Sequence, residues 1–229
     1  MTRYVFEPED SPSVEIEGRA ERFPVHRIYC VGRNYAAHAR EMGKDPDREP
    51  PFFFTKPPDA VVPSGTDVPY PPQTENFHHE IELVVAIGKQ AQGIGEAQAR
   101  DHIYGYAVGN DLTRRDLQLA ARDKGRPWDT GKAFDLSAPI SAIRPAEEIG
   151  HPASGRIWLS VNDEIRQDGD LEELIWGVDE IVSILSGLFV LKPGDLIYTG
   201  TPKGVGPVVP GDLIAGGIDG VGELTTKIV

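Results

Sequence analysis

The sequence predicts an α+β fold: one domain dominated by a rolled or sandwiched β-sheet, with a few short helices. Many short runs of β-forming residues alternate with turn residues, and few segments show helical periodicity. Glycine and proline are frequent, at 25 and 20 residues, which suits a turn-rich β protein. The length of 229 residues allows one full hydrophobic core and leaves little room for a second large domain.

Residues 1–24 are polar and weakly patterned, so we expect a short N-terminal segment there and the main domain over residues 25–229. The first part of the main domain is expected to contain a strand at Arg27–Val31, a helix at Asn34–Met42, a strand from Phe52, a loop at Pro57–Pro72 and a strand at His78–Ile87. Asn34 can cap the helix, and Gly43 is a typical helix stop. The strands are runs of β-formers, the last of which ends at Gly88.

The remaining part continues in the same manner. We expect a polar helix at Glu96–His102, a strand at Ile103–Asn110, a helix at Thr113–Lys124, a hairpin of Arg156–Val161 with Glu164–Gln167, a helix at Val178–Ser186, and strands at Asp195–Thr199, Asp212–Ile214 and Glu223–Ile228. Gly125 can stop the second of these helices, and Asn162-Asp163 is a hairpin-turn signal. Apolar residues recur at helical spacing from Val178.

Glu80 and Glu82 lie two residues apart in an apolar strand, and strand side chains alternate between faces. The two carboxylates therefore point the same way and repel each other, unless a cation binds between them. A lone pair of this kind is more often a solvated surface pair. A third acid, Asp111, follows the strand at Ile103–Asn110, which places it well to meet the pair.

Three carboxylates with no cysteine nearby form a set of hard oxygen ligands, which suits Mg2+ or Mn2+. His78 and His79 leave open a zinc or iron site, although only one of them can share the face of the two glutamates. The single cysteine, Cys30, lies in an apolar run and is expected to be a packed small side chain.

His38 and Glu41 stand three residues apart on the predicted helix at 34–42, and therefore on one face. Histidine is the usual proton-transfer residue near neutral pH, and a carboxylate partner fixes its tautomer. The same spacing also occurs as a routine polar pair on a helix surface. The segment Gly200–Gly206 lacks the ending of a phosphate-binding P-loop and is expected to be a rigid turn that lines a site.

The formal net charge of −13 argues against nucleic acid and against an anionic membrane surface as partners. One cysteine excludes an intramolecular disulfide, which fits a reducing compartment. No signal peptide is visible, and the longest apolar stretch falls far short of the ~20 residues that span a bilayer. We therefore expect a cytoplasmic protein with no membrane partner.

Several stretches together resemble the fumarylacetoacetate hydrolase (FAH) family, and within it the fumarylpyruvate hydrolase and acylpyruvase branch. The matching stretches are Arg27–Met42, Phe54–Pro57, His78–Leu83, Gly105–Tyr106 with Asp111–Asp116, and Leu191–Asp195 with Thr199–Pro202. The resemblance implies an FAH-like mixed β-sandwich roll with a few short helices, and it extends over nearly all of residues 27–212. Residues 1–24 match only loosely.

The same resemblance implies roles for individual residues. It implies that the metal ligands are Glu80, Glu82 and Asp111; that the water-activating pair is His38 and Glu41, on a helix that closes over the site; that Lys132 lies beside the substrate; that Arg115, Gln118 and Thr201 contact the substrate; and that Lys56 supports the metal ligands from outside. A structural ion pair is an equal alternative for Lys56.

The activity implied is Mg2+- or Mn2+-dependent hydrolysis of the C–C bond of a small anionic 2,4-dioxo acid. Within that class the expected substrate is fumarylpyruvate, which is cleaved to fumarate and pyruvate in the catabolism of aromatic compounds such as gentisate. The resemblance also implies a homodimer. Arg33, Arg40 and Arg126 are candidates for the distal carboxylate of such a substrate. Alternatives on the same scaffold are oxaloacetate decarboxylation and the isomerisation or hydration of a dienoic acid. A non-catalytic β-rich binding module with a structural metal is the alternative from another class.

Overall fold

The computed structural model describes residues 3–7, 9–35 and 49–229. Its strands are β1 (Ser13–Glu15), β2 (Arg22–Pro24), β3 (Arg27–Gly32), β4 (Phe52–Lys56), β5 (Val61–Pro63), β6 (Asp67–Val68), β7 (Phe77–His79), β8 (Ile81–Ile87), β9 (Ile103–Asn110), β10 (Thr113–Arg114), β11 (Ala138–Ile140), β12 (Arg144–Pro145), β13 (Arg156–Val161), β14 (Glu164–Asp170), β15 (Asp195–Tyr198), β16 (Gly206–Pro207), β17 (Leu213–Ile218) and β18 (Gly222–Ile228). Its helices are α2 (Arg115–Asp123), α3 (Asp129–Lys132), α4 (Ala146–Ile149) and α5 (Val178–Leu188), with short 3-10 helices η1 (Pro58–Ala60), η2 (Glu96–His102) and η3 (Leu171–Glu173).

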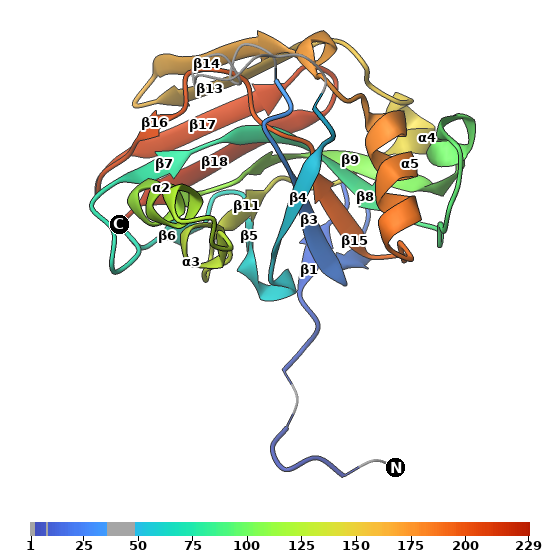
Figure 1. Ribbon diagram of the computed structural model, residues 1–229, viewed down its shortest axis with the longest axis horizontal. Coiled ribbons are helices and arrows are strands. Elements are labelled where there is room, and N and C mark those ends of the chain that lie inside the picture. Colours follow the sequence, from blue (N-terminus) through green and yellow to red (C-terminus); the bar gives the residue numbers. More distant parts are fainter. Residues whose placement is uncertain (1–2, 8, 36–48) are drawn as a thin grey trace.

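Two mixed sheets form the body of the molecule. The larger sheet has the strand order β4-β3-β15-β8-β9-β11-β5, with β12 added beside β9, and the second sheet has the order β14-β13-β17-β18-β6. Figure 1 shows the second sheet along the top, the larger sheet curving below it, α5 at the right and α2 with α3 at the left. The predicted sheet-dominated α+β fold with few short helices is confirmed.

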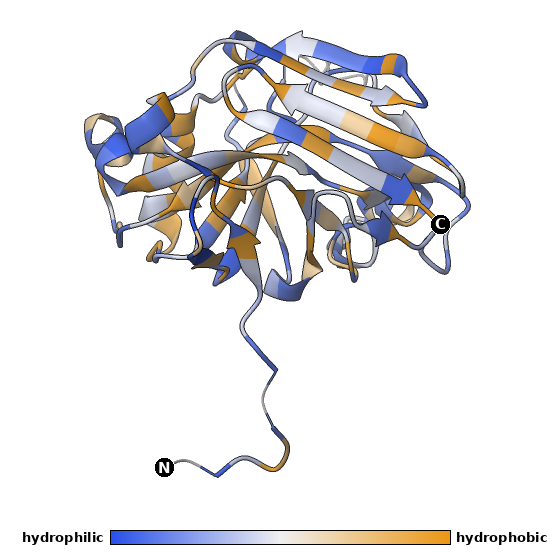
Figure 2. Ribbon diagram, turned by 180° about the vertical axis from the view of Figure 1, so that it is seen from behind, coloured by the Kyte–Doolittle hydropathy of each residue, from blue (hydrophilic) through white to orange (hydrophobic). Residues whose placement is uncertain are grey.

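The core occupies both faces of the larger sheet. On β8, Leu83 and Val85 belong to the large apolar cluster shared with the second sheet. Val84 and Ala86 point the other way, into a smaller cluster inside the curve of the larger sheet. Every residue of β8 is buried, as expected for a strand covered on both faces. In Figure 2, the view from behind, the strands of the second sheet carry hydrophobic residues alternating with polar ones.

Some elements differ from the sequence-based expectation. Residues 57–72, predicted as a loop, contain η1, β5 and β6. The prediction missed these strands because strands of two or three residues are too short to show a clear alternation. The helix predicted from Thr113 begins at Arg115, since Thr113 and Arg114 pair with β7 instead. The strand predicted through Glu80 is broken at that residue into β7 and β8, which belong to different sheets.

Other elements agree closely. The hairpin of β13 and β14 turns at Asn162 and Asp163, whose φ angles of 52° and 65° are those of a type I′ turn. The strand Ile103–Asn110 has the predicted bounds. The helix predicted at 34–42 lies almost wholly outside the described residues. Among the described helices, none combines the length and the apolar character needed to cross a membrane.

The N-terminal segment forms the small hairpin of β1 with β2. Val14 and Phe23 from this hairpin pack into the cluster inside the larger sheet. The division at residue 24 stays a prediction, although residues 13–24 share part of the core with the main domain.

Candidate metal centre

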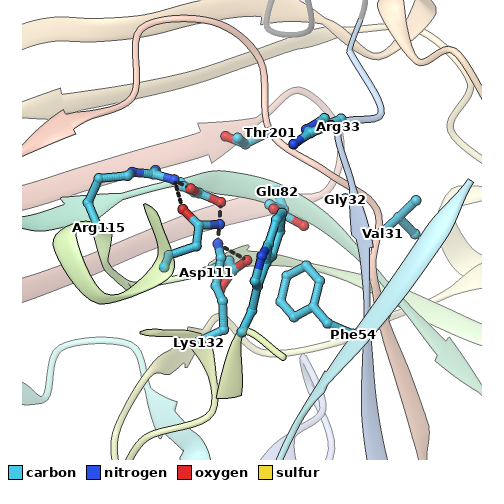
Figure 3. A pocket seen from close by; sticks show the side chains of 12 residues that line it. Val31, Gly32, Arg33, Phe54, Glu82, Asp111, Arg115, Lys132 and Thr201 are labelled. Carbon is cyan, nitrogen blue, oxygen red and sulfur yellow. Dashed lines mark hydrogen bonds and ion pairs between the residues drawn. The ribbon is translucent and has the colours of Figure 1, made fainter. Parts of the chain in front are cut away.

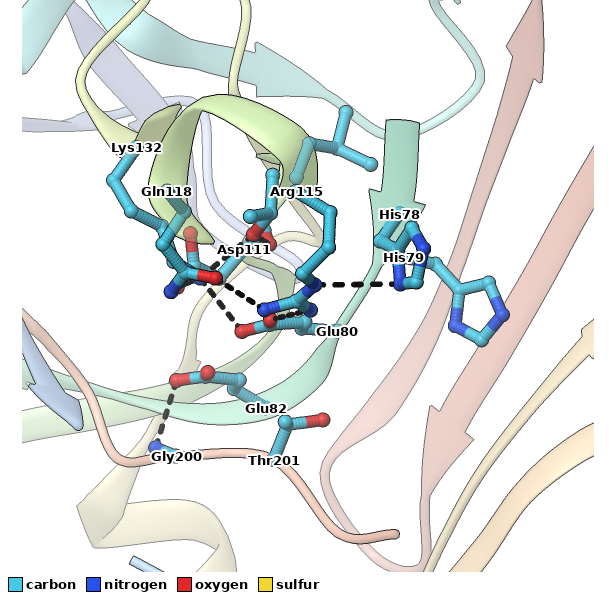
Figure 4. A network of polar contacts seen from close by, with 12 residues as sticks. His78, His79, Glu80, Glu82, Asp111, Arg115, Gln118, Lys132, Gly200 and Thr201 are labelled. Carbon is cyan, nitrogen blue, oxygen red and sulfur yellow. Dashed lines mark hydrogen bonds and ion pairs between the residues drawn. The ribbon is translucent and has the colours of Figure 1, made fainter. Parts of the chain in front are cut away.

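Three acidic side chains meet at the open end of the curved larger sheet. Glu80 lies at the junction of β7 and β8, Glu82 lies in β8, and Asp111 follows β9. The three are 5%, 2% and 1% exposed, and one oxygen of each lies within 4.8 Å of the others. Figure 4 shows the three side chains converging from these two neighbouring strands. The predicted convergence of the three acids is therefore present.

The pairing of β8 with β9 explains this convergence. Ile81 is opposite Asn110, so the chain beyond each residue brings Glu80 and Asp111 next to each other. The Asp111 N–H donates to the Glu80 carbonyl over 2.8 Å, and the Glu80 N–H donates to Oδ1 of Asn110 over 2.8 Å. Glu82 shares the face of Val84 and Ala86, which places its carboxylate at the end of the inner cluster.

Buried cations surround the three acids. Lys132 Nζ donates to Glu80 Oε2 over 2.7 Å and to Asp111 Oδ2 over 2.6 Å. Arg115 donates to the other oxygen of Glu80 and, over 2.5 Å, to Oε1 of Gln118. Lys56 Nζ lies 2.8 Å from Asp111 Oδ1, the ion pair that was the alternative for this lysine. Among the described residues, three acids and three cations meet here, and their formal charges cancel.

The pKa shifts of Glu82 and Lys132 reflect the repulsion and attraction among these buried charges. Burial, then repulsion by Asp111 and Glu80, raises the pKa of Glu82 well above its usual range. Burial alone would lower the pKa of Lys132, but the attraction of Asp111 and Glu80 outweighs it and raises that pKa. Lys132 is therefore a charged ammonium, and a cation bound beside Glu82 would favour the ionised form of its carboxyl group.

The donor set fits a hard divalent cation. All three side chains offer carboxylate oxygens, which Mg2+ and Mn2+ prefer. Oδ1 of Asp111 accepts no hydrogen bond from the described residues, although Lys56 faces it as an ion-pair partner. Because no hydrogen bond from these residues occupies the lone pairs of this buried oxygen, the oxygen can ligate a metal ion.

The two neighbouring histidines bond elsewhere. His79 Nδ1 lies 2.8 Å from Oε1 of Gln167, and His78 Nε2 lies 2.8 Å from Oδ1 of Asn76. Burial, then the charge of Arg115, lowers the pKa of His78 to about 4, so its ring is neutral. Among the described residues, the ligand group contains the three acids and neither histidine, so the structure does not support the zinc or iron alternative.

The turn that begins at Gly200 closes another side of the site. The Gly200 N–H donates to Oε2 of Glu82 over 2.7 Å. Gly200 has a φ of 102°, and a Cβ there would lie 2.7 Å from Cβ of Asn34, so this position requires glycine. The turn predicted in this segment therefore lines the site, as expected.

Sequence reasoning missed Gln167, a fully buried residue of β14 in the second sheet. Its Nε2 donates to Oγ1 of Thr201 over 2.8 Å and to the Pro202 carbonyl over 2.9 Å, and its Oε1 accepts from the Ile81 N–H over 3.1 Å. Because Thr201 Oγ1 accepts from an amide, its own O–H hydrogen is available to a ligand. Gln167 stands in a polar hairpin strand, and only the pairing of the chain in space reveals its position.

The three acids, together with Lys132, Arg115 and Thr201, line one small pocket. The lining residues are Val31, Gly32, Arg33, Phe54, Glu80, Glu82, Asp111, Arg115, Gln118, Trp128, Lys132 and Thr201. The pocket thus brings together the predicted metal ligands, Lys132 and the three predicted substrate contacts (Figure 3). His38 and Glu41 lie outside the described residues.

A sheet-dominated α+β fold with buried carboxylates gathered in a pocket defines a candidate metal-dependent enzyme. The chain belongs to the fumarylacetoacetate hydrolase family: the family model described as Fumarylacetoacetate (FAA) hydrolase C-terminal matches residues 27–229. This finding confirms the family that the sequence motifs indicate.

Individual relatives refine the comparison. A fumarylpyruvate hydrolase of Ralstonia sp is 50% identical over 189 residues, which are 82% of this chain and 98% of that protein. The mitochondrial oxaloacetate tautomerase FAHD1 of Bos taurus is 45% identical over 201 residues, 88% of this chain and 90% of that protein. The crystal structure of fumarylpyruvate hydrolase from Pseudomonas aeruginosa in complex with Mn2+ and pyruvate superposes with a TM-score of 0.97 at 57% identity, and the match covers 99% of each chain.

Proposed function

We propose that this protein is a divalent-metal-dependent hydrolase that cleaves the C–C bond of acylpyruvates, with fumarylpyruvate as its substrate and Mg2+ or Mn2+ as its metal. The observation that carries the proposal is the meeting of Glu80, Glu82 and Asp111 inside a pocket lined by Lys132, Arg115 and Thr201. Relatives that are 50% and 57% identical and are named fumarylpyruvate hydrolase support the choice of substrate.

Charge balance also favours a doubly anionic substrate. Among the described residues, the three acids and the three cations around them cancel formally, so a bound divalent ion and Arg33 in the same pocket would leave the site positively charged. Fumarylpyruvate carries two carboxylates and would offset most of that charge. The local field would therefore attract the substrate even though the whole chain has a net charge of −13.

The residues would divide the work of hydrolysis as follows. When bound, the metal ion supplies Lewis acidity and holds the oxo acid in one orientation. His38, oriented by Glu41, takes a proton from the water that attacks the C4 carbonyl. Lys132 Nζ directs its three N–H donors to Glu80, Asp111 and Thr113, and it would exchange one of these bonds for a bond to the oxyanion that develops on the C4 oxygen. The C3–C4 bond then breaks. The electron pair stays on C3, which takes up a proton to give pyruvate, while C4 becomes a carboxyl group of fumarate.

The direct test is an ultraviolet assay of fumarylpyruvate cleavage, with fumarate and pyruvate measured as products. We expect turnover that depends on Mn2+ or Mg2+ and stops when a chelator removes the ion. Absence of cleavage by the metal-loaded protein would refute the proposal. The assay also separates an enzyme from a binding module with a structural metal.

A second candidate is oxaloacetate tautomerisation, which the 45% identity to the Bos taurus enzyme favours. The enol and keto forms of oxaloacetate can be followed by absorbance on the same preparation. A kcat/KM for this interconversion far above that for fumarylpyruvate would reverse the order of the two candidates. The homodimer and the cytoplasmic location stay predictions from the resemblance and the composition.

We expect His38→Ala to lower kcat at least about 100-fold, because general acid–base catalysis contributes that much or more. The affinity for Mn2+ should change little, since His38 is not among the proposed ligands. Turnover and Mn2+ titration on the same variant check both parts. Normal turnover would remove His38 from the mechanism, and a parallel loss of Mn2+ binding would assign it to the metal instead.

We expect Gln167→Glu to raise the KM for the substrate roughly tenfold with a smaller effect on kcat. The new carboxylate accepts a hydrogen bond where the amide donates one, so the Thr201 O–H would turn toward it and away from the substrate carboxylate. Steady-state kinetics measure the split between KM and kcat. Gln98→Glu, on exposed η2, is the matched control. Equal kinetics for both variants would show that Thr201 needs no orientation by Gln167.

A further inference from the structure

Arg33 differs from the other cations of the pocket. Arg115 and Lys132 are both bound to Glu80, and Lys132 also bonds to Asp111. Arg33 lines the same pocket, but it makes no hydrogen bond or ion pair with its side chain among the described residues. Its Nε is buried and has no partner there. A half-buried guanidinium without an anion is a ready partner for a ligand carboxylate.

The backbone holds Arg33 in an uncommon conformation. Its φ is 58°, in the left-handed region, which is unfavourable for a residue with a side chain. Asn34 fixes the chain on one side, because its Nδ2 donates to the carbonyls of Trp176 and Thr199 over 2.9 and 2.8 Å, and its Oδ1 accepts from the Trp176 N–H. The end of β3 therefore presents Arg33 in one fixed direction, as is common at functional sites.

The ring of Phe52 also holds the side chain of Arg33 in place. The guanidinium carbon lies 5.5 Å from the ring centroid, a cation–π contact. The ring can come this close to β3 because the preceding residue is Gly32, where a Cβ would lie 2.0 Å from the ring. Burial, then the charge of Arg122, lowers the pKa of Arg33, and the charge of Glu49 opposes this shift. The surroundings thus position the cation without neutralising it.

We propose that Arg33 binds the terminal carboxylate of the acyl group and so selects dicarboxylic acylpyruvates. This inference rests on the proposed function and adds the residue that recognises the distal end of the substrate. In Figure 3, Arg33 and Arg115 enter the view from opposite sides of the acids. The metal ligands and Thr201 serve the pyruvyl end and Lys132 serves the C4 oxygen, which leaves Arg33 for the terminal carboxylate.

The described structure gives no support to the other two arginines that the sequence offers as partners of the terminal carboxylate. Arg126 is exposed and does not line the pocket. Arg40 lies outside the described residues. Arg126 is therefore a matched control for the removal of one positive charge.

The test compares fumarylpyruvate with an analogue in which a methyl group replaces the terminal carboxylate. The variants are Arg33→Asn, which suits a left-handed backbone, Arg33→Lys, which keeps the charge, and Arg126→Asn as control. For each Mn2+-loaded protein, kcat/KM is measured with both compounds, and calorimetry gives the two dissociation constants. Circular dichroism verifies that each variant is folded.

We expect Arg33→Asn to lower the preference for fumarylpyruvate over the methyl analogue about 10- to 100-fold, the effect of losing one charge-assisted hydrogen bond. Arg33→Lys should lose less of it, and Arg126→Asn should keep the preference of the parent. An unchanged preference, or an equal loss with both compounds, would overturn the role of Arg33. A parent protein that binds both compounds but cleaves neither refutes the hydrolase instead, and the ratio of dissociation constants then still tests Arg33.

Discussion

Glu82→Gln is expected to remove metal binding and activity together while leaving the protein folded. The variant should bind Mn2+ more than about 100-fold more weakly, since even residues that only support metal ligands are worth 10- to 100-fold. Its kcat/KM for fumarylpyruvate should fall by about 1,000-fold or more, because the ion supplies several kcal/mol of charge stabilisation. Mn2+ titration by calorimetry and the ultraviolet assay measure the two effects.

The stability of the metal-free variant distinguishes a loss of metal binding from a loss of folding. The substituted glutamine side chain has the shape of the carboxylate of Glu82, and its amide oxygen can still accept from the Gly200 N–H. The substitution also ends the repulsion by Asp111 and Glu80 that raises the pKa of Glu82. The metal-free variant should therefore be at least as stable in urea as the metal-free parent. A clearly less stable variant would point to a structural role for Glu82.

Glu75→Gln is a matched control for this experiment. Glu75 is an exposed residue in the loop before β7, so an amide at this position should leave Mn2+ affinity and turnover unchanged. If Glu82→Gln and Glu75→Gln bound Mn2+ equally well, the three acids would not be the ligands.

The acid pair shows what a sequence pattern can and cannot predict. Alternation along a strand predicts that Glu80 and Glu82 share a direction, and the two carboxylates do meet. The strand, however, is broken at Glu80, where the chain passes from one sheet to another. The uninterrupted run of β-formers gives no sign of this break, because strand propensity is local whereas the change of sheet depends on pairing partners far along the chain.

The position of Asp111 was predictable for a related reason. Its strand ends beside a long run of β-formers, and antiparallel neighbours bring such ends together. Lys132 and Gln167 were harder to place by pattern. Lys132 ends a helix of four residues, too short for any periodicity, and its role came only from the family resemblance. Gln167 reaches the site from the second sheet, and no local signal indicates which sheet will cover which.

The buried charges explain why the family resemblance, and not any local sequence pattern, predicted most of the site residues. Cationic partners reach the cluster from three distant segments: Lys56 from β4, Arg115 from α2 and Lys132 from α3. Removing one partner from such a cluster leaves an uncompensated buried charge, which is strongly unfavourable. The segments that carry these residues therefore depend on one another, although nothing in any single segment reveals its partners.

Lys132→Met is the second substitution with a large expected effect, and it acts on both stability and turnover. Lys132 is 2% exposed, and its ammonium bonds to Glu80, Asp111 and the Thr113 hydroxyl. Methionine fills similar space but leaves the acids without this charge. In the absence of metal, the free energy of unfolding should fall by about 3–5 kcal/mol. In the presence of saturating Mn2+ the deficit should shrink, because the ion neutralises the same carboxylates.

Turnover should not recover with stability. The proposed oxyanion donor is missing in Lys132→Met, so kcat should stay about 100- to 1,000-fold below the parent even when Mn2+ has restored the fold. Urea unfolding with and without Mn2+, together with kcat at saturating metal, separates the two roles. Lys124→Met, at an exposed position after α2, controls for the loss of a lysine. Recovery of both stability and kcat with Mn2+ would make Lys132 a structural counter-ion and not the donor to the oxyanion. If metal-free Lys132→Met were as stable as the metal-free parent, the charge balance described for the cluster would be wrong.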